Sequence, residues 1–175
     1  MVAPFLQKVI AFHGESRVPS FAERAKDNLK MLGIELKLIP VTTVGSLKDK
    51  AGAAIKEADA LWFINDPIVG GREAFEFLRD ETIRQKKPLI ASLSDQFAEL
   101  GAFMTVAVDF KAIGAQAASM ARQVLVEQAQ LKDLGIRAPM AGRLTVNLDA
   151  ANRIQLSVAP ETLPNINRII GTTED

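Results

Sequence analysis

Residues 101–125, GAFMTVAVDFKAIGAQAASMARQVL, decide the fold. A short apolar strand at residues 103–108 runs into Asp109, and an Ala-rich helix with Gly114 one turn inside it follows. Two earlier apolar stretches, DALWFINDP at residues 59–67 and KPLIAS at residues 87–92, also lead into small polar or acidic residues. This order of strand, polar end and helix indicates a mainly parallel sheet covered by helices.

The same alternation extends towards the amino terminus. Further apolar strands are expected at residues 8–12 and 35–39, besides those at residues 60–64 and 89–92. Ser20 with Glu23 forms a capping box that begins a helix, Gly33 supplies its left-handed stop, and Ser46 with Asp49 begins the next helix. We therefore expect an α/β domain with a mainly parallel five-stranded sheet of flavodoxin-like order 2-1-3-4-5 and helices on both faces.

The carboxyl-terminal part has a looser pattern. The long helix is expected from residue 112 to about 132, folded back on the sheet with Ile113, Ala117, Ala121 and Leu125 inward. Residues 1–132 would form the α/β lobe. Residues 133–175 would add a loop, a short strand at 144–148, a helical turn at 149–153 and a tail helix near 163–170, all packed on the same domain.

Composition excludes several classes of function. The chain has 175 residues, enough for one ordinary core, and its 21 basic and 21 acidic residues balance. No net field therefore recruits nucleic acid or an anionic membrane, and no stretch has the roughly 20 apolar residues that span a bilayer. The chain has no Cys and a single His, His13, so we expect no metal and no cofactor. The first residues read as a strand, without the features of a signal peptide.

Candidate binding residues follow from the strand positions. In an open parallel sheet, ligands bind outside the carboxyl ends of the strands. Each candidate also has a structural interpretation as a helix cap or a turn former, and Asp109 is most simply the cap of the long helix. The expected ligand-binding set comprises Ser16, Ser20, Asn65, Asp66, Ser94 and Asp95.

Catalytic motifs are absent from the sequence. There is no Gly-x-Ser-x-Gly elbow, no Walker motif, and Gly70-Gly71-Arg72 does not extend into a dinucleotide fingerprint. A phosphorelay receiver would match the five βα units, but it needs an acidic pair after the first strand and a Lys after the fifth. This chain has Glu15 and then Asp109-Phe110 at those places. We therefore expect no enzyme activity.

Five motifs, in order, resemble the carboxyl-terminal half of a two-lobed periplasmic binding protein, the solute-binding component of ABC transporters. The first motif is the strand at residues 8–12 followed by His13 to Ser16, and the second is Asp66, after the third strand. The other three motifs are Ser92, Ser94 and Asp95; Gly101-Ala102 with Val108-Asp109-Phe110 and Ile113-Gly114; and Val146-Asn147-Leu148 with Ala151. The match covers residues 8–170 but no amino-terminal lobe.

The resemblance implies a non-enzymatic domain that binds an amino acid or a similar small polar solute, as a fragment or as a single-lobe form. An ammonium group would suit Asp66 or Asp95. Implied partners are the solute and an ABC transporter permease, with a homodimer as a further expectation. The location would be periplasmic or extracytoplasmic within a longer secreted precursor, and cytoplasmic if the chain is complete. The alternative is a regulatory, sensor or protein-interaction module with the same fold.

Overall fold

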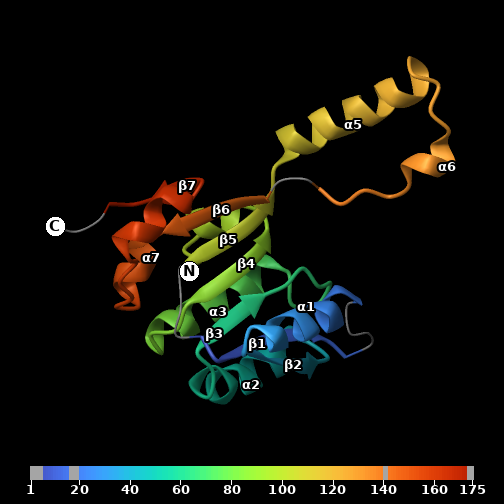
Figure 1. Cartoon of the computed structure of the whole chain (residues 1–175). Helices are drawn as coiled ribbons and strands as arrows, with labels where there is room; N and C mark the ends of the chain where they lie inside the picture. The colour runs from blue at the N-terminus through green and yellow to red at the C-terminus, as the bar shows by residue number, and fades with distance from the viewer. Residues whose placement is uncertain (1–5, 16–19, 140–141, 173–175) are drawn as a thin grey trace.

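In a computed structural model, described for residues 6–15, 20–139 and 142–172, the chain forms a seven-stranded sheet with helices on both faces (Figure 1). The strand order is β2-β1-β3-β4-β5-β6-β7. The predicted α/β class is confirmed, and the first five strands are parallel in the predicted order. The predicted count of five strands is wrong, because β6 and β7 extend the sheet beyond β5.

The parallel part of the sheet is built from short βα units. Its strands are β1 (Lys8–Gly14), β2 (Glu35–Val41), β3 (Ala60–Phe63), β4 (Leu89–Leu93) and β5 (Met104–Val108). The connecting helices are α1 (Ser20–Met31), α2 (Val44–Lys56), α3 (Arg72–Arg84) and the short α4 (Gln96–Glu99). Gly33, at φ 76°, follows α1 as predicted. Thr43, and not Ser46, is the N-cap of α2, because its side chain accepts a hydrogen bond from the Ser46 N–H at 3.1 Å.

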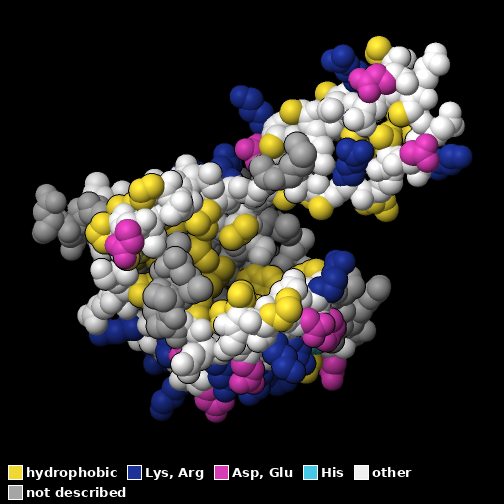
Figure 2. Space-filling view, viewed as in Figure 1, with side chains coloured by type: hydrophobic (Ala, Val, Ile, Leu, Met, Phe, Trp, Pro, Cys, Tyr) yellow, Lys and Arg dark blue, Asp and Glu magenta, His cyan; other side chains and the backbone are white. Residues whose placement is uncertain are grey.

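The two faces of the sheet are covered unequally. Phe63 of β3 packs edge-on against Phe75 of α3, with ring centroids 5.2 Å apart. The preceding Trp62 points to the opposite face and meets Phe21 of α1 at 5.9 Å. On that face α1 leaves part of the sheet open, and Val106 of β5 is 50% exposed. Figure 2 shows apolar side chains gathered in the middle of the body, with an arm projecting to the upper right.

The arm consists of α5 (Phe110–Leu125), α6 (Leu131–Leu134) and the return segment up to residue 139. It extends away from the sheet (Figure 1), and α5 has no buried residue. The expectation that this helix folds back with Ile113, Ala117, Ala121 and Leu125 inward is therefore wrong, as is its extension to residue 132. Of the predicted apolar stripe, Ala117, Ala121 and Leu125 are exposed and Ile113 is half-buried.

The carboxyl-terminal part returns to the sheet. It comprises β6 (Gly142–Asn147), α7 (Leu148–Arg153), the 3-10 helix η1 (Pro160–Asn165) and β7 (Arg168–Ile170). β6 pairs antiparallel with β5, and β7 pairs parallel with β6. The predicted strand at 144–148 and turn at 149–153 are present. The predicted tail helix at 163–170 is wrong, because residues 168–170 instead take up the free edge of β6. Throughout the described part of the chain, no helix is long and apolar enough to cross a membrane.

Candidate functional site

The carboxyl ends of β3 and β4 border a hollow of about 220 Å³. Its lining is partly polar and partly aromatic. The lining residues are Phe63, Asn65, Gly70, Ser92, Ser94 and Phe97. The parallel topology thus brings the predicted residues Asn65 and Ser94 into one hollow, together with Ser92. Ser16 lies outside the described residues, and of Ser20 only its place at the start of α1 is described.

Asp66 lies directly after Asn65, and its carboxylate accepts hydrogen bonds from the surrounding backbone. Its carboxylate accepts hydrogen bonds from the N–H groups of Gly14 at 3.0 Å, Ile68 at 2.8 Å and Val69 at 3.2 Å. Burial alone would raise the pKa of the Asp66 carboxyl, but the three N–H donors outweigh burial and hold the pKa below its usual value. Asp66 therefore ties the end of β1 to the loop after β3 as an ionised group.

Gly70 allows this loop to close on itself. Its N–H donates to the carbonyl oxygen of Asp66 at 2.7 Å. A Cβ atom added to Gly70 would lie 2.6 Å from the same oxygen, closer than real Cβ atoms come. The neighbouring Gly71 has open space at the corresponding position and is the N-cap residue of α3. The shape of the hollow at Asn65 thus depends on residue 70 being a glycine.

The hydroxyl oxygens of the two serines that line the hollow are already engaged. The indole N–H of Trp62 donates to Ser92 Oγ at 2.7 Å, and the backbone N–H of Gln96 donates to Ser94 Oγ at 3.2 Å. Each hydroxyl therefore keeps its own hydrogen for another acceptor. The Ser92 hydroxyl lies on the Trp62 face of the sheet, and Ser94 follows at the end of β4, so the two serines place hydrogen-bond donors around the carboxyl end of this strand.

Asp95 is paired with a residue that sequence reasoning missed. Its side chain is 8% exposed, and Oδ2 lies 2.5 Å from Nη2 of Arg143 on β6. Oδ1 is 3.4 Å from the hydroxyl of Thr105. Nothing in the sequence around Arg143 pointed to this pair, because it forms only when β6 returns antiparallel beside β5.

Two other predicted edge residues have structural roles. Asp109 caps α5, since its Oδ1 accepts from the N–H groups of Lys111 and Ala112 at 2.9 and 3.0 Å. His13 is 4% exposed, and its Nδ1 lies 2.9 Å from the carbonyl oxygen of Gly14. Across the described residues, no group of three or more His, Asp or Glu side chains is arranged to hold a metal ion.

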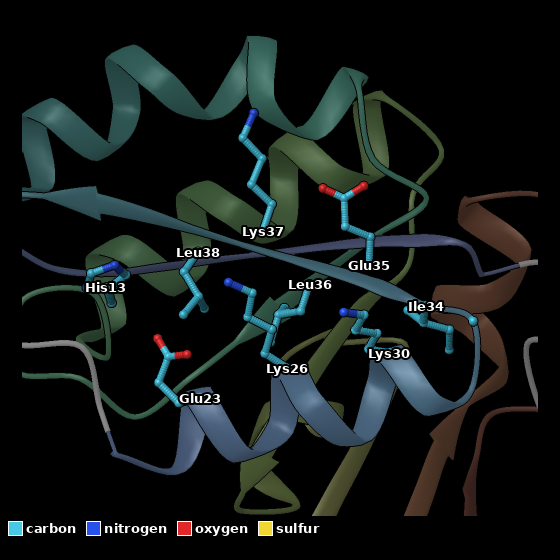
Figure 3. A pocket seen from close by; sticks show the side chains of 10 residues that line it. His13, Glu23, Lys26, Lys30, Ile34, Glu35, Leu36, Lys37 and Leu38 are labelled. Atoms are coloured by element: carbon cyan, nitrogen blue, oxygen red, sulfur yellow. The ribbon is translucent and has the colours of Figure 1, made fainter.

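A larger hollow of about 760 Å³ lies between α1 and β2 (Figure 3). Lys26 and Lys30 extend from α1 into it, opposite Leu36 and Leu38 of β2. Both lysines are exposed, and Glu23 lies one turn before Lys26 on the same helix. The charges are mixed and solvated, as on an ordinary edge strand. We therefore place the candidate site at the smaller hollow beyond β3 and β4.

Comparison with known proteins identifies the family. The profile of the family described as ABC transporter substrate binding protein matches residues 1–166. The chain belongs to this family. A search of curated proteins finds no match for the sequence.

Solved structures similar to this family member agree in fold. A ligand-free, open substrate-binding protein with adhesive properties from Clostridium difficile has a TM-score of 0.79 and 18% identity, over 98% of this chain and 57% of that one. An ABC domain in complex with L-Trp from Streptococcus pneumoniae has a TM-score of 0.73 and 19% identity, over 97% and 57%. A conserved domain protein from Vibrio cholerae has a TM-score of 0.73 and 18% identity, over 96% and 56%. The chain therefore spans little more than half the length of these proteins.

Proposed function

We propose that this substrate-binding family member is a non-enzymatic lobe that holds a small polar solute, such as an amino acid, in the hollow at the carboxyl ends of β3 and β4. The observation that carries the proposal is the lining of that hollow. Asn65, Ser92 and Ser94 supply polar groups, while Phe63 and Phe97 supply an apolar wall. A few placed polar groups on an apolar wall are typical of small-molecule sites. The L-Trp bound to the Streptococcus pneumoniae protein supports an amino acid as the solute.

The small size of the hollow suggests that a second lobe completes the binding site. At about 220 Å³ it is smaller than the roughly 300–1,000 Å³ of sites that bury most of a ligand. The exposed Ala117, Ala121 and Leu125 of α5 offer a surface on which such a lobe would pack, and the similar structures are longer than this chain. On this proposal the chain acts in a longer or two-part protein outside the cytoplasm, and it delivers its solute to an ABC transporter permease.

Trp62 provides an internal reporter for the test. It is the only Trp of the chain, and its N–H donates to Ser92 at the hollow. Amino acids, nucleosides and small sugars would be titrated at millimolar concentration while Trp62 emission and ¹H–¹⁵N spectra are recorded; tryptophan itself would be followed by the spectra alone. We expect one class to shift resonances around the hollow.

Variants of the lining residues, compared with a control variant far from the hollow, show whether the response comes from binding at the hollow. Asn65→Ala and Ser94→Ala should each weaken the response. The control Asn152→Ala, on an exposed position of α7 at the opposite edge, should leave it unchanged. A protein that responds to no solute class, even when an amino-terminal lobe is added, would contradict the proposal.

A protein-interaction module is the second candidate, and the open sheet face favours it. Val106 is 50% exposed there, and Phe110 and Leu125 at the two ends of α5 are 74% and 80% exposed. Exposed apolar surface of this kind marks interaction sites. Sedimentation equilibrium of the isolated chain tests the candidate. A homodimer would support it, whereas a strict monomer at high concentration would count against self-association.

A further inference from the structure

The aspartates at the carboxyl edge of the sheet are all engaged within the protein. Asp66 accepts three backbone N–H groups, and Asp109 accepts two from the first turn of α5. Asp95 is paired with Arg143. Asp66 and Asp95 therefore already have partners within the protein, whereas both bonds of Asp109 end on Oδ1. The binding of an ammonium group by Asp66 or Asp95 stays a prediction, in which the solute would share the carboxylate with its present partners.

The two serines that line the hollow, and Arg143 on the nearby strand β6, carry hydrogen-bond donors. The hydroxyls of Ser92 and Ser94 each accept an N–H and keep a hydrogen to donate. The Arg143 side chain is 46% exposed although one of its nitrogens meets the buried carboxylate of Asp95. A guanidinium has five N–H donors, so an ion pair with one carboxylate leaves donors for a second anion.

The sheet register places Arg143 two strands away from the end of β4, where Ser94 lines the hollow. Arg143 lies opposite Ala107 of β5, and Ala107 lies opposite Leu93 of β4, immediately before Ser94. Two strand spacings separate the backbones of Arg143 and Leu93, or about 10 Å, which an Arg side chain largely spans. The ion pair with Asp95 directs the guanidinium towards the β4 side, because Asp95 follows Ser94 in the chain.

The other acidic side chain at this edge is distant. Glu15 is exposed in the turn after β1. Four strand spacings separate β1 from β6, so Glu15 and Arg143 are about 19 Å apart along the edge. On the β4 to β6 side of the edge, Asp95 pairs with Arg143 and Asp109 caps α5.

We propose that Arg143 anchors the carboxylate of the solute, with Asp95 as the positioning residue that holds the guanidinium beside Ser94. The substrate class is then a small carboxylate, amino acids included, bound through its acid group. This inference rests on the proposed function of the same hollow. It adds a specificity-determining residue on β6, a strand that was not expected to reach the site.

The test compares ligands that differ only in the acid group. Each standard L-amino acid and its primary amide would be titrated into the ¹⁵N-labelled chain, with inorganic phosphate as a separate probe. The side-chain Nε–H resonance of Arg143 reports contact with the anion. We expect at least one acid to bind about tenfold or more tightly than its amide, with a shift of that resonance, because a charge-assisted hydrogen bond is lost in the amide.

The variants distinguish an anchor from a structural ion pair. Arg143→Gln alone leaves a buried carboxylate unpaired, so the double variant Asp95→Asn with Arg143→Gln is the main test. It should fold and lose the preference for acid over amide. Arg143→Lys should retain part of it. The control Arg168→Gln removes a comparable ion pair, with Glu99 at 2.7 Å, from β7 and should retain the full preference.

The outcomes separate this inference from the proposed function. Equal binding of acid and amide, or a preference that survives in the double variant, would overturn the role of Arg143 and leave the hollow as the solute site. A shift of the Arg143 resonance by phosphate equal to that by the acids would overturn the carboxylate class. Failure of every organic probe to bind would remove the proposed function and this inference with it.

Discussion

Asp66→Asn should destabilise the protein by about 2–3 kcal/mol. The amide oxygen of Asn can still accept from the N–H groups of Ile68 and Val69, but its NH₂ group then faces the N–H of Gly14, which now lies 3.0 Å from Oδ2. Two donors face each other there, and a buried N–H is left without an acceptor, which costs about 1–3 kcal/mol. Loss of the negative charge weakens the other two bonds as well.

Urea unfolding, followed by Trp62 emission and by circular dichroism, measures this loss. For a chain of this length, 1 kcal/mol corresponds to about 2–4 °C in Tm, so a thermal scan should show a decrease of roughly 4–12 °C. Asp109→Asn is the matched control. Both of its backbone bonds end on one oxygen, Oδ1, which Asn retains, so its stability should change by less than about 0.5 kcal/mol. The reasoning is refuted if Asp66→Asn costs less than about 0.5 kcal/mol or if both variants lose stability equally.

Three further predictions concern the loop, the arm and the dependence of stability on pH. Gly70→Ala should cost about 1–3 kcal/mol in urea unfolding, because its Cβ would meet the carbonyl oxygen of Asp66 at 2.6 Å. Gly71→Ala meets open space and changes only the N-cap of α3, so it should cost less, about 1 kcal/mol or below. Ala117→Gly in the exposed α5 should raise local hydrogen exchange without moving the global urea midpoint; a clear shift of that midpoint would show that α5 is packed in solution. The pKa of Asp59, like that of Asp66, lies below its usual 3.8, mainly because the backbone N–H of Gln7 donates to the Asp59 carboxylate. A lowered folded-state pKa gives stability that is present above pH 3.8 and is lost as the pH falls through the folded-state value, so acid unfolding should begin below about pH 4 and be less steep in Asp66→Asn.

Local patterns predicted the βα units well, because each is encoded within a short stretch. The apolar run of β1, the stop at Gly33 and the cap at Asp109 depend on neighbours in sequence, and all three are present. The arm shows the limit of such patterns. The spacing of Ile113 and Leu125 indicates an apolar face on a helix, but it does not say whether the covering surface belongs to the same chain.

Long-range pairing explains the remaining errors. Residues 168–170 form a strand only because β6 offers them a free edge, so a helix was a reasonable but wrong interpretation of that stretch. At the site, parallel topology delivered Asn65 and Ser94 to one hollow. The partner of Asp95, by contrast, comes from a strand near the other end of the chain, and no local signal reveals it.

Because β5 pairs antiparallel with β6, the segment between these strands could be removed from the protein. Val108 lies directly opposite Gly142, so the chain departs from the sheet and re-enters it at the same point. Antiparallel neighbours can be joined by a two-residue turn. A tight hairpin could therefore replace the segment between Val108 and Gly142 without moving any other strand. Whatever binds to that segment is connected to the sheet through two adjacent strand ends.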